Sequence, residues 1–246
     1  MAISIFNLNC WLFPPPISAD CNNRLSSIID LIKERDPKII CLQEVWSNKY
    51  LEYLKQKLTN YHCVSSGSLF YNQSGLAIFL KEKPLSFRVN FFKLSFRHNF
   101  TEWFLRKGYI EANIKINGVK WTIVNTHLYA AFSKKTEIII EKQFLELISK
   151  ISGTDVFLCG DLNLEEGKFE KLNQGRFSRL CDLQNTSDVN NPYARKRFNS
   201  FIIGNKSKKI DYLIYKSGPA VQSEYEVIKK PFVSDHYPMF CQATFI

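Results

Sequence analysis

Several features that often define a class of protein are missing from this sequence. The seven cysteines form no CxxC pair and follow no regular spacing, which argues against a disulfide scaffold and a structural zinc site and favours a reducing compartment. No apolar run approaches the roughly 18 residues of a membrane-spanning helix. The first residues lack the basic segment of a signal peptide. We therefore expect a cytoplasmic protein with no transmembrane segment, whose only contact with a membrane would be peripheral.

The composition that remains is that of a folded domain. Of the 246 residues, 45% are hydrophobic and 14% are aromatic, enough for a sizeable core. There are no internal repeats, linkers or low-complexity tracts, so we expect residues 1–246 to form a single catalytic domain. Lys and Arg outnumber Asp and Glu by 33 to 23, a net charge of +10. Such a charge attracts nucleic acid, anionic membranes or phosphorylated small molecules, but a solvated lysine-rich surface explains it equally well.

Hydrophobic periodicity predicts an alternation of strands and helices. Strands are expected at 3–8, 38–42, 61–65, 75–80, 84–94, 108–116, 119–125, 156–159, 197–203 and 209–215, with a last strand running to Phe245. Helices are expected after an N-cap at Asn23, near 47–58 and near 135–151. Residues 10–16 contain three prolines and are expected to form a loop, and Asn117-Gly118 predicts a tight hairpin. Residues 95–107 receive no prediction.

Polar side chains recur where these strands end. The stretch from Asp155 to Asn163 is the plainest case, because a buried strand is followed by Gly160, Asp161 and Asn163. On an extended segment, Asp161 and Asn163 would face the same way. Similar polar groups mark the other strand ends: Asn9, Glu44, His127, Asp235 and His236, with Asp211 inside a late strand. If the strands are neighbours, these groups converge on one edge.

Oxygen donors dominate this set and suit a hard cation. Glu44, Asp161, Asp235 and Asn9 match Mg²⁺ or its substitute Mn²⁺ better than zinc. Asn7 shares the direction of Asn9, so either asparagine could be the ligand, although the position in the motif favours Asn9.

The histidines of the set suggest acid–base chemistry. His236 would need a carboxylate to orient its ring and raise its basicity, and Asp211 is the candidate. His127 then remains to donate to a phosphoryl oxygen.

In this order, six motifs resemble the endonuclease/exonuclease/phosphatase superfamily over essentially the whole chain. They are Asn9, Leu42-Gln-Glu44, Asn125-Thr-His127, Gly160-Asp-Leu-Asn163, Ile210-Asp-Tyr212 and Ser234-Asp-His236. The resemblance implies an α/β four-layer sandwich, in which two mostly antiparallel sheets pack face to face and helices flank them. It also implies a Mg²⁺-dependent phosphoesterase with Glu44 as principal metal ligand, Asn9 and Asp235 nearby, and His236, oriented by Asp211, as general base. Asp161 would position the nucleophile, the leaving oxygen or a second metal, while Asn163 and His127 would bind the phosphate.

Finer motifs resemble the neutral sphingomyelinase branch. They are Asn7-Leu-Asn-Cys-Trp11, Glu44-Val-Trp46, Ser74-Gly-Leu76, Arg106-Lys-Gly-Tyr109 and Thr126-His-Leu-Tyr-Ala130. A phosphodiester lipid of the sphingomyelin type is therefore the expected substrate. The aromatic residues between Phe91 and Phe104 could face lipid, although packing in the core and loops explains them better.

The basic segment 195–209 supports the main alternative, a nuclease. It contains six basic residues and no acidic one, and its interleaved phenylalanines would suit stacking on nucleic-acid bases. The same charge would attract lipid head groups. Arg195, Arg197 and Lys107 are the candidate substrate-binding cations. A soluble inositol- or sugar-phosphate phosphatase and an inactive binding module are the remaining alternatives, and oligomeric state is left open.

Overall fold

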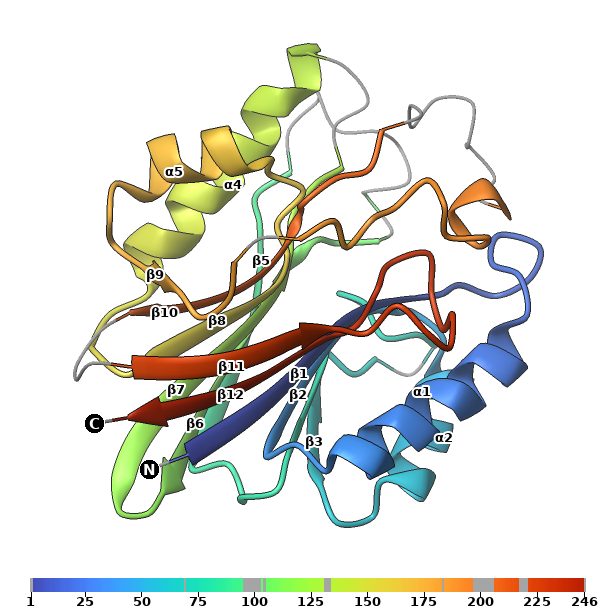
Figure 1. Ribbon diagram of the computed structural model, residues 1–246, viewed down its shortest axis with the longest axis horizontal. Coiled ribbons are helices and arrows are strands. Elements are labelled where there is room, and N and C mark those ends of the chain that lie inside the picture. The colour runs from blue at the N-terminus through green and yellow to red at the C-terminus, as the bar shows by residue number, and fades with distance from the viewer. Residues whose placement is uncertain are drawn as a thin grey trace.

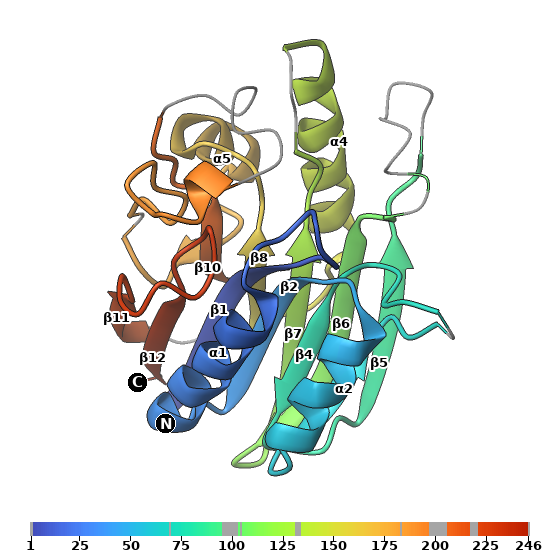
Figure 2. The ribbon, with the colours of Figure 1, turned by 90° about the vertical axis from the view of Figure 1, so that its right-hand side faces the viewer.

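Two six-stranded sheets lie face to face in this computed structural model, and helices cover their outer faces (Figures 1 and 2). The structure describes residues 2–68, 70–94, 103, 105–130, 134–182, 184–196, 206–216 and 221–245. Both sheets are mixed but mostly antiparallel. The predicted four-layer α/β sandwich is therefore confirmed.

The first sheet joins the two ends of the chain. Its strand order is β11-β12-β1-β2-β4-β3, and only β1 and β2 run parallel among its neighbours. The strands are β1 (Ala2–Leu12), β2 (Ile39–Val45), β3 (His62–Ser65), β4 (Ala77–Leu80), β11 (Val221–Val227) and β12 (Met239–Phe245). Because β12 pairs with β1, residues just before β12 come close to the end of β1.

The second sheet is built from the middle of the chain. Its order is β5-β6-β7-β8-β10-β9, with β7 and β8 parallel. The strands are β5 (Ser86–Phe91), β6 (Gly108–Ile116), β7 (Val119–His127), β8 (Val156–Asp161), β9 (Ser178–Arg179) and β10 (Asp211–Lys216). The β6–β7 hairpin turns at Asn117 and Gly118, which have φ of 49° and 86°, the backbone that a two-residue hairpin requires.

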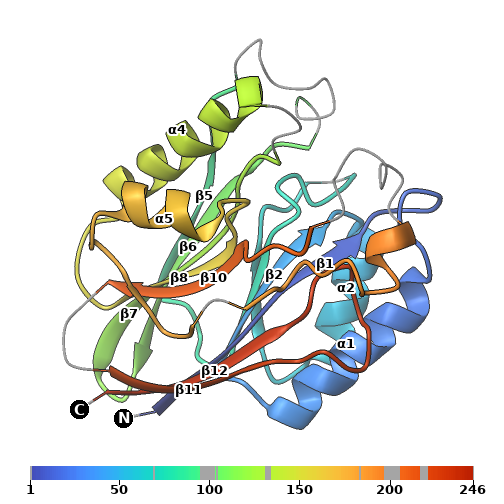
Figure 3. The ribbon, with the colours of Figure 1, turned by 45° about the horizontal axis from the view of Figure 1, so that its top comes forward.

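Helices cover the outer face of each sheet (Figure 3). Along the chain they are α1 (Cys21–Arg35), α2 (Asn48–Lys57), α4 (Lys134–Lys150) and α5 (Glu166–Asn173), with a short 3₁₀ helix η1 (Ala194–Lys196). Apolar side chains of α1 and α2 pack with Phe6 and Ile40 of the first sheet. Those of α4 and α5 pack with Leu158 and Tyr212 of the second. Within the described residues, no helix is both long and apolar enough to cross a membrane.

The layer between the sheets changes character along the strands. Alternate residues of a strand face the same side, and the inward-facing series runs from apolar to polar in each central strand. In β1 it passes from Ile5 to Asn7 and Asn9, and in β8 from Phe157 through Cys159 to Asp161. This places one polar edge at the end of an otherwise hydrocarbon core.

Gly160 allows the two parallel strands at that edge to approach closely. Its φ is 145°, and a Cβ atom there would lie 2.0 Å from the carbonyl oxygen of Thr126. Only glycine fits such a contact without moving the backbone. The glycine that precedes Asp161 therefore sets the spacing of β7 and β8 beneath the polar edge.

Several local predictions were wrong. Cys10 to Leu12 continue β1 instead of forming a loop, because Leu12 still pairs with Val45 of β2 beyond a shift in register and the prolines begin only at Pro14. Asn23 lies inside α1, which begins at Cys21 after Asp20. Strand β11 had no prediction, because its exposed alternate residues give it a weak hydrophobic signal. The predicted strand 197–203 lies outside the described residues.

Candidate active site

Strand register brings the predicted polar residues to one edge of the two sheets. In the second sheet, Asp161 pairs with His127 of β7 on one side and with Asp211 of β10 on the other. In the first sheet, Asn9 of β1 pairs with Gln43 of β2, the residue before Glu44. The loop that leads into β12 adds Asp235 and His236. These residues are buried, except for Glu44, which is partly exposed.

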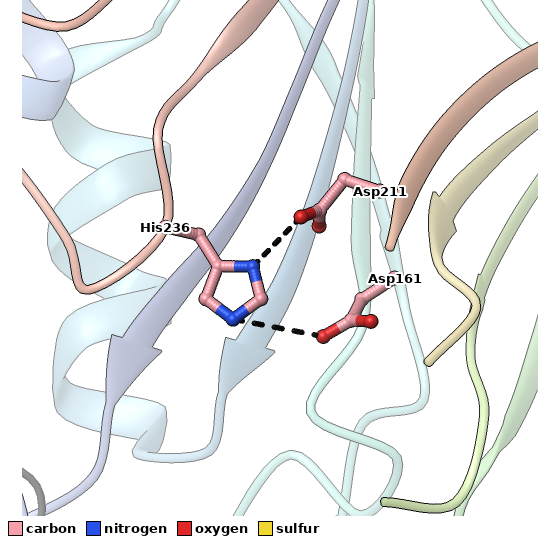
Figure 4. A group of neighbouring side chains, drawn as sticks. All are labelled: Asp161, Asp211 and His236. Atoms are coloured by element: carbon pink, nitrogen blue, oxygen red, sulfur yellow. Dashed lines mark hydrogen bonds and ion pairs between the residues drawn. The ribbon is translucent and has the colours of Figure 1, made fainter. Parts of the chain in front are cut away.

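His236 and Asp211 form a buried pair (Figure 4). Nδ1 of His236 donates to Oδ2 of Asp211 at 2.8 Å, while Nε2 lies 3.9 Å from Oδ2 of Asp161. Burial lowers the pKa of the imidazole, but the charge of Asp211 and the hydrogen bond to it outweigh burial and raise the pKa to about 10. The pair leaves Nε2 pointing toward Asp161.

Asn9 links two carboxylates at the centre of the site. Its Nδ2 donates to Oε1 of Glu44 at 3.2 Å and to Oδ2 of Asp161 at 3.0 Å. Burial raises the pKa of Asp161 to about 7, and the charge of Asp211 adds to the rise. Burial also raises the pKa of Glu44, although Lys107 opposes this effect. Neither carboxylate is well stabilised in its charged form by the protein alone.

His127 lies between the same carboxylates and is held neutral. Its Nε2 is 3.5 Å from Asp161 and 3.8 Å from Glu44, and Nζ of Lys107 lies 3.0 Å from its ring nitrogens. Burial, followed by the charges of Lys107 and His236, lowers the pKa of His127 well below its usual range. A neutral imidazole at this place can donate or accept one hydrogen bond but carries no charge.

The donor set fits a divalent cation. Oε1 of Glu44 and Oδ2 of Asp161 face one amide nitrogen, and the raised pKa values of these buried carboxyl groups show that a cation beside them would stabilise their charged forms. Asp161, Asp211 and His236 form a second possible metal-binding group, with ligand atoms within 4.8 Å of one another. That second group is already engaged in the Asp211–His236 hydrogen bond, so the oxygens around Asn9 are the better match for a hard cation.

Strained backbone marks the same edge. Trp11, Glu44 and Asn163 have φ of 48°, 57° and 50°, in the left-handed region that side chains with a Cβ atom rarely occupy. Each residue lies at or just beyond a strand that contributes to the site. Strain of this kind clusters at functional sites, where the surrounding structure supports it.

Not every predicted site residue takes the expected pose. Asn163 does not continue an extended segment: β8 ends at Asp161, the Asn163 N–H donates to Asp161 Oδ1 at 2.9 Å, and its side chain donates to the Leu128 carbonyl at 3.1 Å. The assumption that Asp161 and Asn163 face one way along a strand was wrong. The structure brings Asn9 to Glu44, whereas Asn7 accepts from Gln43 at 2.9 Å.

Of the predicted substrate-binding cations, only Lys107 is described next to the site residues. Lys107 is buried beside His127, with Nζ 5.6 Å from the centre of the Trp46 ring. Arg195 is exposed on η1, and its Nε lies 3.4 Å from the carbonyl oxygen of Val189. Arg197 lies outside the described residues. Among the aromatics between 91 and 104, Phe92 is buried and Trp103 is 49% exposed, while Phe96, Phe100 and Phe104 also fall outside the described residues.

Sequence reasoning missed a buried amide network behind the site. Nε2 of Gln43 donates to Oδ1 of Asn125 at 2.7 Å as well as to Asn7, and Asn125 donates to the carbonyls of Leu42 and Ala77. The network joins both sheets. Gln43 and Asn125 stand within the motifs, so their alternation with Cys41 and His127 was the available signal.

Two further buried residues were missed altogether. Arg24 donates to the carbonyls of Cys10, Trp11 and Val233 and thereby ties the end of β1 to the loop before Asp235. Thr186 donates its hydroxyl to Asp211. Neither residue stands in a motif or at a strand end, and nothing in its local sequence marks it.

Two solved structures have the same fold as this chain. Sphingomyelinase C from Streptomyces griseocarneus matches with a TM-score of 0.80 at 16% identity, over 99% of this chain and all of that one. TDP2 from D. rerio in complex with a single-strand DNA product matches with a TM-score of 0.75 at 17% identity, over 99% of each chain. These likenesses show the fold: the chain is a DNase I-like α/β sandwich.

The particular family follows from the sequence. Residues 6–236 match the profile of the Endonuclease/Exonuclease/phosphatase family, and the chain belongs to that family of phosphoester hydrolases. It is 26% identical to human sphingomyelin phosphodiesterase 2 over 88% of this chain and 56% of that protein. It is 24% identical to a Caenorhabditis elegans protein described as a putative neutral sphingomyelinase, over 88% of this chain and 58% of that one. The chain thus spans somewhat more than half the length of these relatives.

Proposed function

We propose that residues 1–246 form one catalytic unit that hydrolyses a phosphodiester lipid of the sphingomyelin type in a Mg²⁺-dependent reaction. The observation that carries the proposal is the His236–Asp211 pair, whose free Nε2 faces Asp161 at 3.9 Å beside the Glu44–Asn9–Asp161 cluster. The similarity to sphingomyelin phosphodiesterase 2 favours the lipid. The reaction is the attack of water on phosphorus, with cleavage of the P–O bond to the lipid alcohol.

His236 is the proposed general base. Its Nε2 takes a proton from water, while Asp211 holds Nδ1 and stabilises the imidazolium that forms. The pKa of about 10 reflects uncompensated carboxylates, since Asp211, Asp235 and Asp161 all raise it. A cation held by Glu44, Asn9 and Asp235 would offset part of this carboxylate charge and so lower the pKa of His236.

Glu44, Asn9 and Asp235 are proposed to hold Mg²⁺, with Mn²⁺ as a substitute. The bound ion supplies charge stabilisation at the phosphoryl oxygens. The partial exposure of Glu44 leaves this cluster open to a substrate, and Ser234 fixes Asp235 by donating its hydroxyl to the carboxylate at 3.1 Å. Carboxylate and amide oxygens are the ligands that suit such an ion.

His127, Lys107 and Asn163 are proposed to contact the phosphate. Lys107 brings a buried positive charge within 3.0 Å of the His127 ring. A buried cation attracts an anionic phosphoryl group more strongly than an exposed one. Asp161 is proposed to position the attacking water or the leaving oxygen, because it accepts from Asn9 and lies close to both histidines.

A nuclease is the second candidate. The net charge of +10 favours it, as does the structural likeness to TDP2 bound to a single-strand DNA product. Arg195 and Arg197 would bind the phosphates of the nucleic-acid backbone in that case. A soluble inositol- or sugar-phosphate phosphatase is a third candidate that uses the same residues, and an inactive binding module is the least favoured reading.

A phosphoester panel tests the proposal. The chain is incubated with sphingomyelin in detergent micelles, lysolipids, inositol phosphates, plasmid, abasic-site duplex and single-stranded RNA, each with Mg²⁺ and with EDTA. We expect phosphocholine release from sphingomyelin that EDTA abolishes. Cleavage of nucleic acid without lipid turnover would establish the second candidate, and turnover that persists in EDTA would contradict the metal requirement.

A further inference from the structure

The two members of the His236–Asp211 pair come from different sheets. Asp211 begins β10 in the second sheet, whereas His236 lies in the loop that leads into β12 in the first. No single strand therefore sets their separation of 2.8 Å. The separation depends on how the loop around residues 234–237 is held against the second sheet.

The segment 186–191 holds that loop. The Thr186 carbonyl accepts from the Tyr237 N–H at 2.8 Å, and Nδ2 of Asn191 donates to the Ser234 carbonyl at 2.8 Å. These two contacts flank His236 on both sides along the chain.

The same segment is tied to the approach to β10. The Thr186 N–H donates to the Lys208 carbonyl at 3.1 Å, and the Lys208 N–H donates to the Ser187 carbonyl at 2.7 Å. Lys208 stands three residues before Asp211. The segment thus joins the two chain regions that carry the pair.

The side chain of Thr186 completes the link. It is fully buried, and its hydroxyl donates to Oδ2 of Asp211, the same oxygen that accepts from Nδ1 of His236. A buried hydroxyl is normally hydrogen-bonded, and a donor on a carboxylate forms a stronger bond than one on a neutral acceptor. Two donors on one oxygen restrict rotation of the carboxyl group and keep Oδ2 facing the ring.

We propose that Thr186 is a positioning residue that fixes Asp211 against His236 and docks the His236 loop on the second sheet. The inference rests on the proposed hydrolysis for its kinetic consequence, but its structural consequence stands apart from any substrate. Thr186 touches no reacting atom, so its effect passes through the orientation of the His236 ring.

The test compares two substitutions at this position. Thr186→Val keeps the shape and removes the donor, and Thr186→Ser keeps the donor. Loss of the partner that orients a metal-ligating side chain typically costs about 10- to 100-fold, and we expect a similar cost for a partner that orients a general base. We expect Thr186→Val to lower kcat by about 10-fold or more with little change in KM, and Thr186→Ser to stay near the starting enzyme.

Thr122→Val is the matched control. Thr122 lies on β7 well before His127, and its hydroxyl donates to Oδ1 of Asn113 at 2.9 Å. The substitution removes an equivalent hydroxyl with no link to Asp211, so kcat should not change. Thermal denaturation of all variants separates misfolding from mispositioning.

A proton NMR spectrum gives a readout that needs no substrate. The hydrogen-bonded Nδ1–H of His236 should give a downfield resonance, assigned by its loss in His236→Ala, that is retained in Thr186→Ser and lost or broadened in Thr186→Val. An unchanged resonance and unchanged kcat in Thr186→Val would overturn the inference. An unaltered starting protein that turns over no phosphoester would instead overturn the proposed function, while the resonance still decides the role of Thr186.

Discussion

At one end of the space between the sheets, Trp121 stacks on Phe157 with ring centroids 5.2 Å apart, and Phe245 lies 4.6 Å from the Trp121 ring. At the other end, the strands that carry Trp121 and Phe157 end in His127 and Asp161, whose side chains lie 3.5 Å apart. The first end is stabilised by burial of aromatic surface. The second contains buried carboxyl groups whose charged forms burial disfavours. The hydrocarbon end therefore stabilises the packing of the two sheets, and this packing holds the polar side chains in place at the other end.

The largest effect on catalysis is expected from a substitution at the polar end. His236→Ala should lower kcat by about 10³-fold or more, which corresponds to about 4 kcal/mol in the barrier. In the metal-free protein the melting temperature should also fall, because removal of the imidazole leaves the buried carboxyl group of Asp211 without its partner. Steady-state kinetics with thermal denaturation checks both parts, and a variant that keeps most of its activity would show that the base lies elsewhere.

A substitution at the hydrocarbon end should lower stability without lowering kcat. Phe157→Ala removes a fully buried ring that contacts three other aromatic rings, and we expect a loss of about 3 kcal/mol in the free energy of unfolding. The kcat per folded molecule should remain near that of the unaltered protein. Urea denaturation measures the first quantity and active-site-normalised kinetics the second. A large fall in kcat without loss of stability would contradict the division between the two ends.

The polar end should also make stability depend on pH when divalent cations are removed. Asp161 and His236 both have pKa values raised in the folded state, to about 7 and about 10, so the folded protein binds more protons than the unfolded chain. Stability then falls as pH rises. The charged form of Asp161 becomes increasingly unfavourable between about pH 4 and 7, and the contribution of protonated His236, complete below about pH 6.5, is lost as pH rises toward 10.

We expect a total loss of several kcal/mol in the free energy of unfolding across this range in EDTA, measured by urea denaturation at successive pH values. Asp161→Asn should abolish the loss of stability between pH 4 and 7, and added Mg²⁺ should reduce the loss of stability in the unaltered protein. A stability that rises through this interval would show that these carboxyl groups are charged and well compensated without a cation.

Much of the fold could be predicted because its signals are local. The backbone preference of Asn117-Gly118 alone predicts the hairpin. The apolar composition of the runs that form β6, β7 and β8 is enough to predict these strands. Strand β11 was not predicted because three of its seven residues are exposed. The end of β1 was missed because nearby prolines suggested a loop, whereas pairing of Leu12 with Val45 of β2 extends the strand to Leu12.

The candidate site also has a part that could be predicted from the sequence and a part that could not. Which strands carry carboxylates, amides and imidazoles at their ends could be predicted from the sequence. The apolar run and its polar group are adjacent in the chain, so the pattern can be recognised without knowing the neighbouring strands. Which of these groups meet depends on the tertiary structure. Asn9 rather than Asn7 contacts Glu44, Asn163 turns toward Leu128, and Thr186 lies against Asp211. The physical reason is distance along the chain. Thr186 and Asp211 are 25 residues apart, and Asn9 and Asp161 are 152 apart, so their contacts arise from the stacking of two sheets and the docking of loops, which no local pattern encodes.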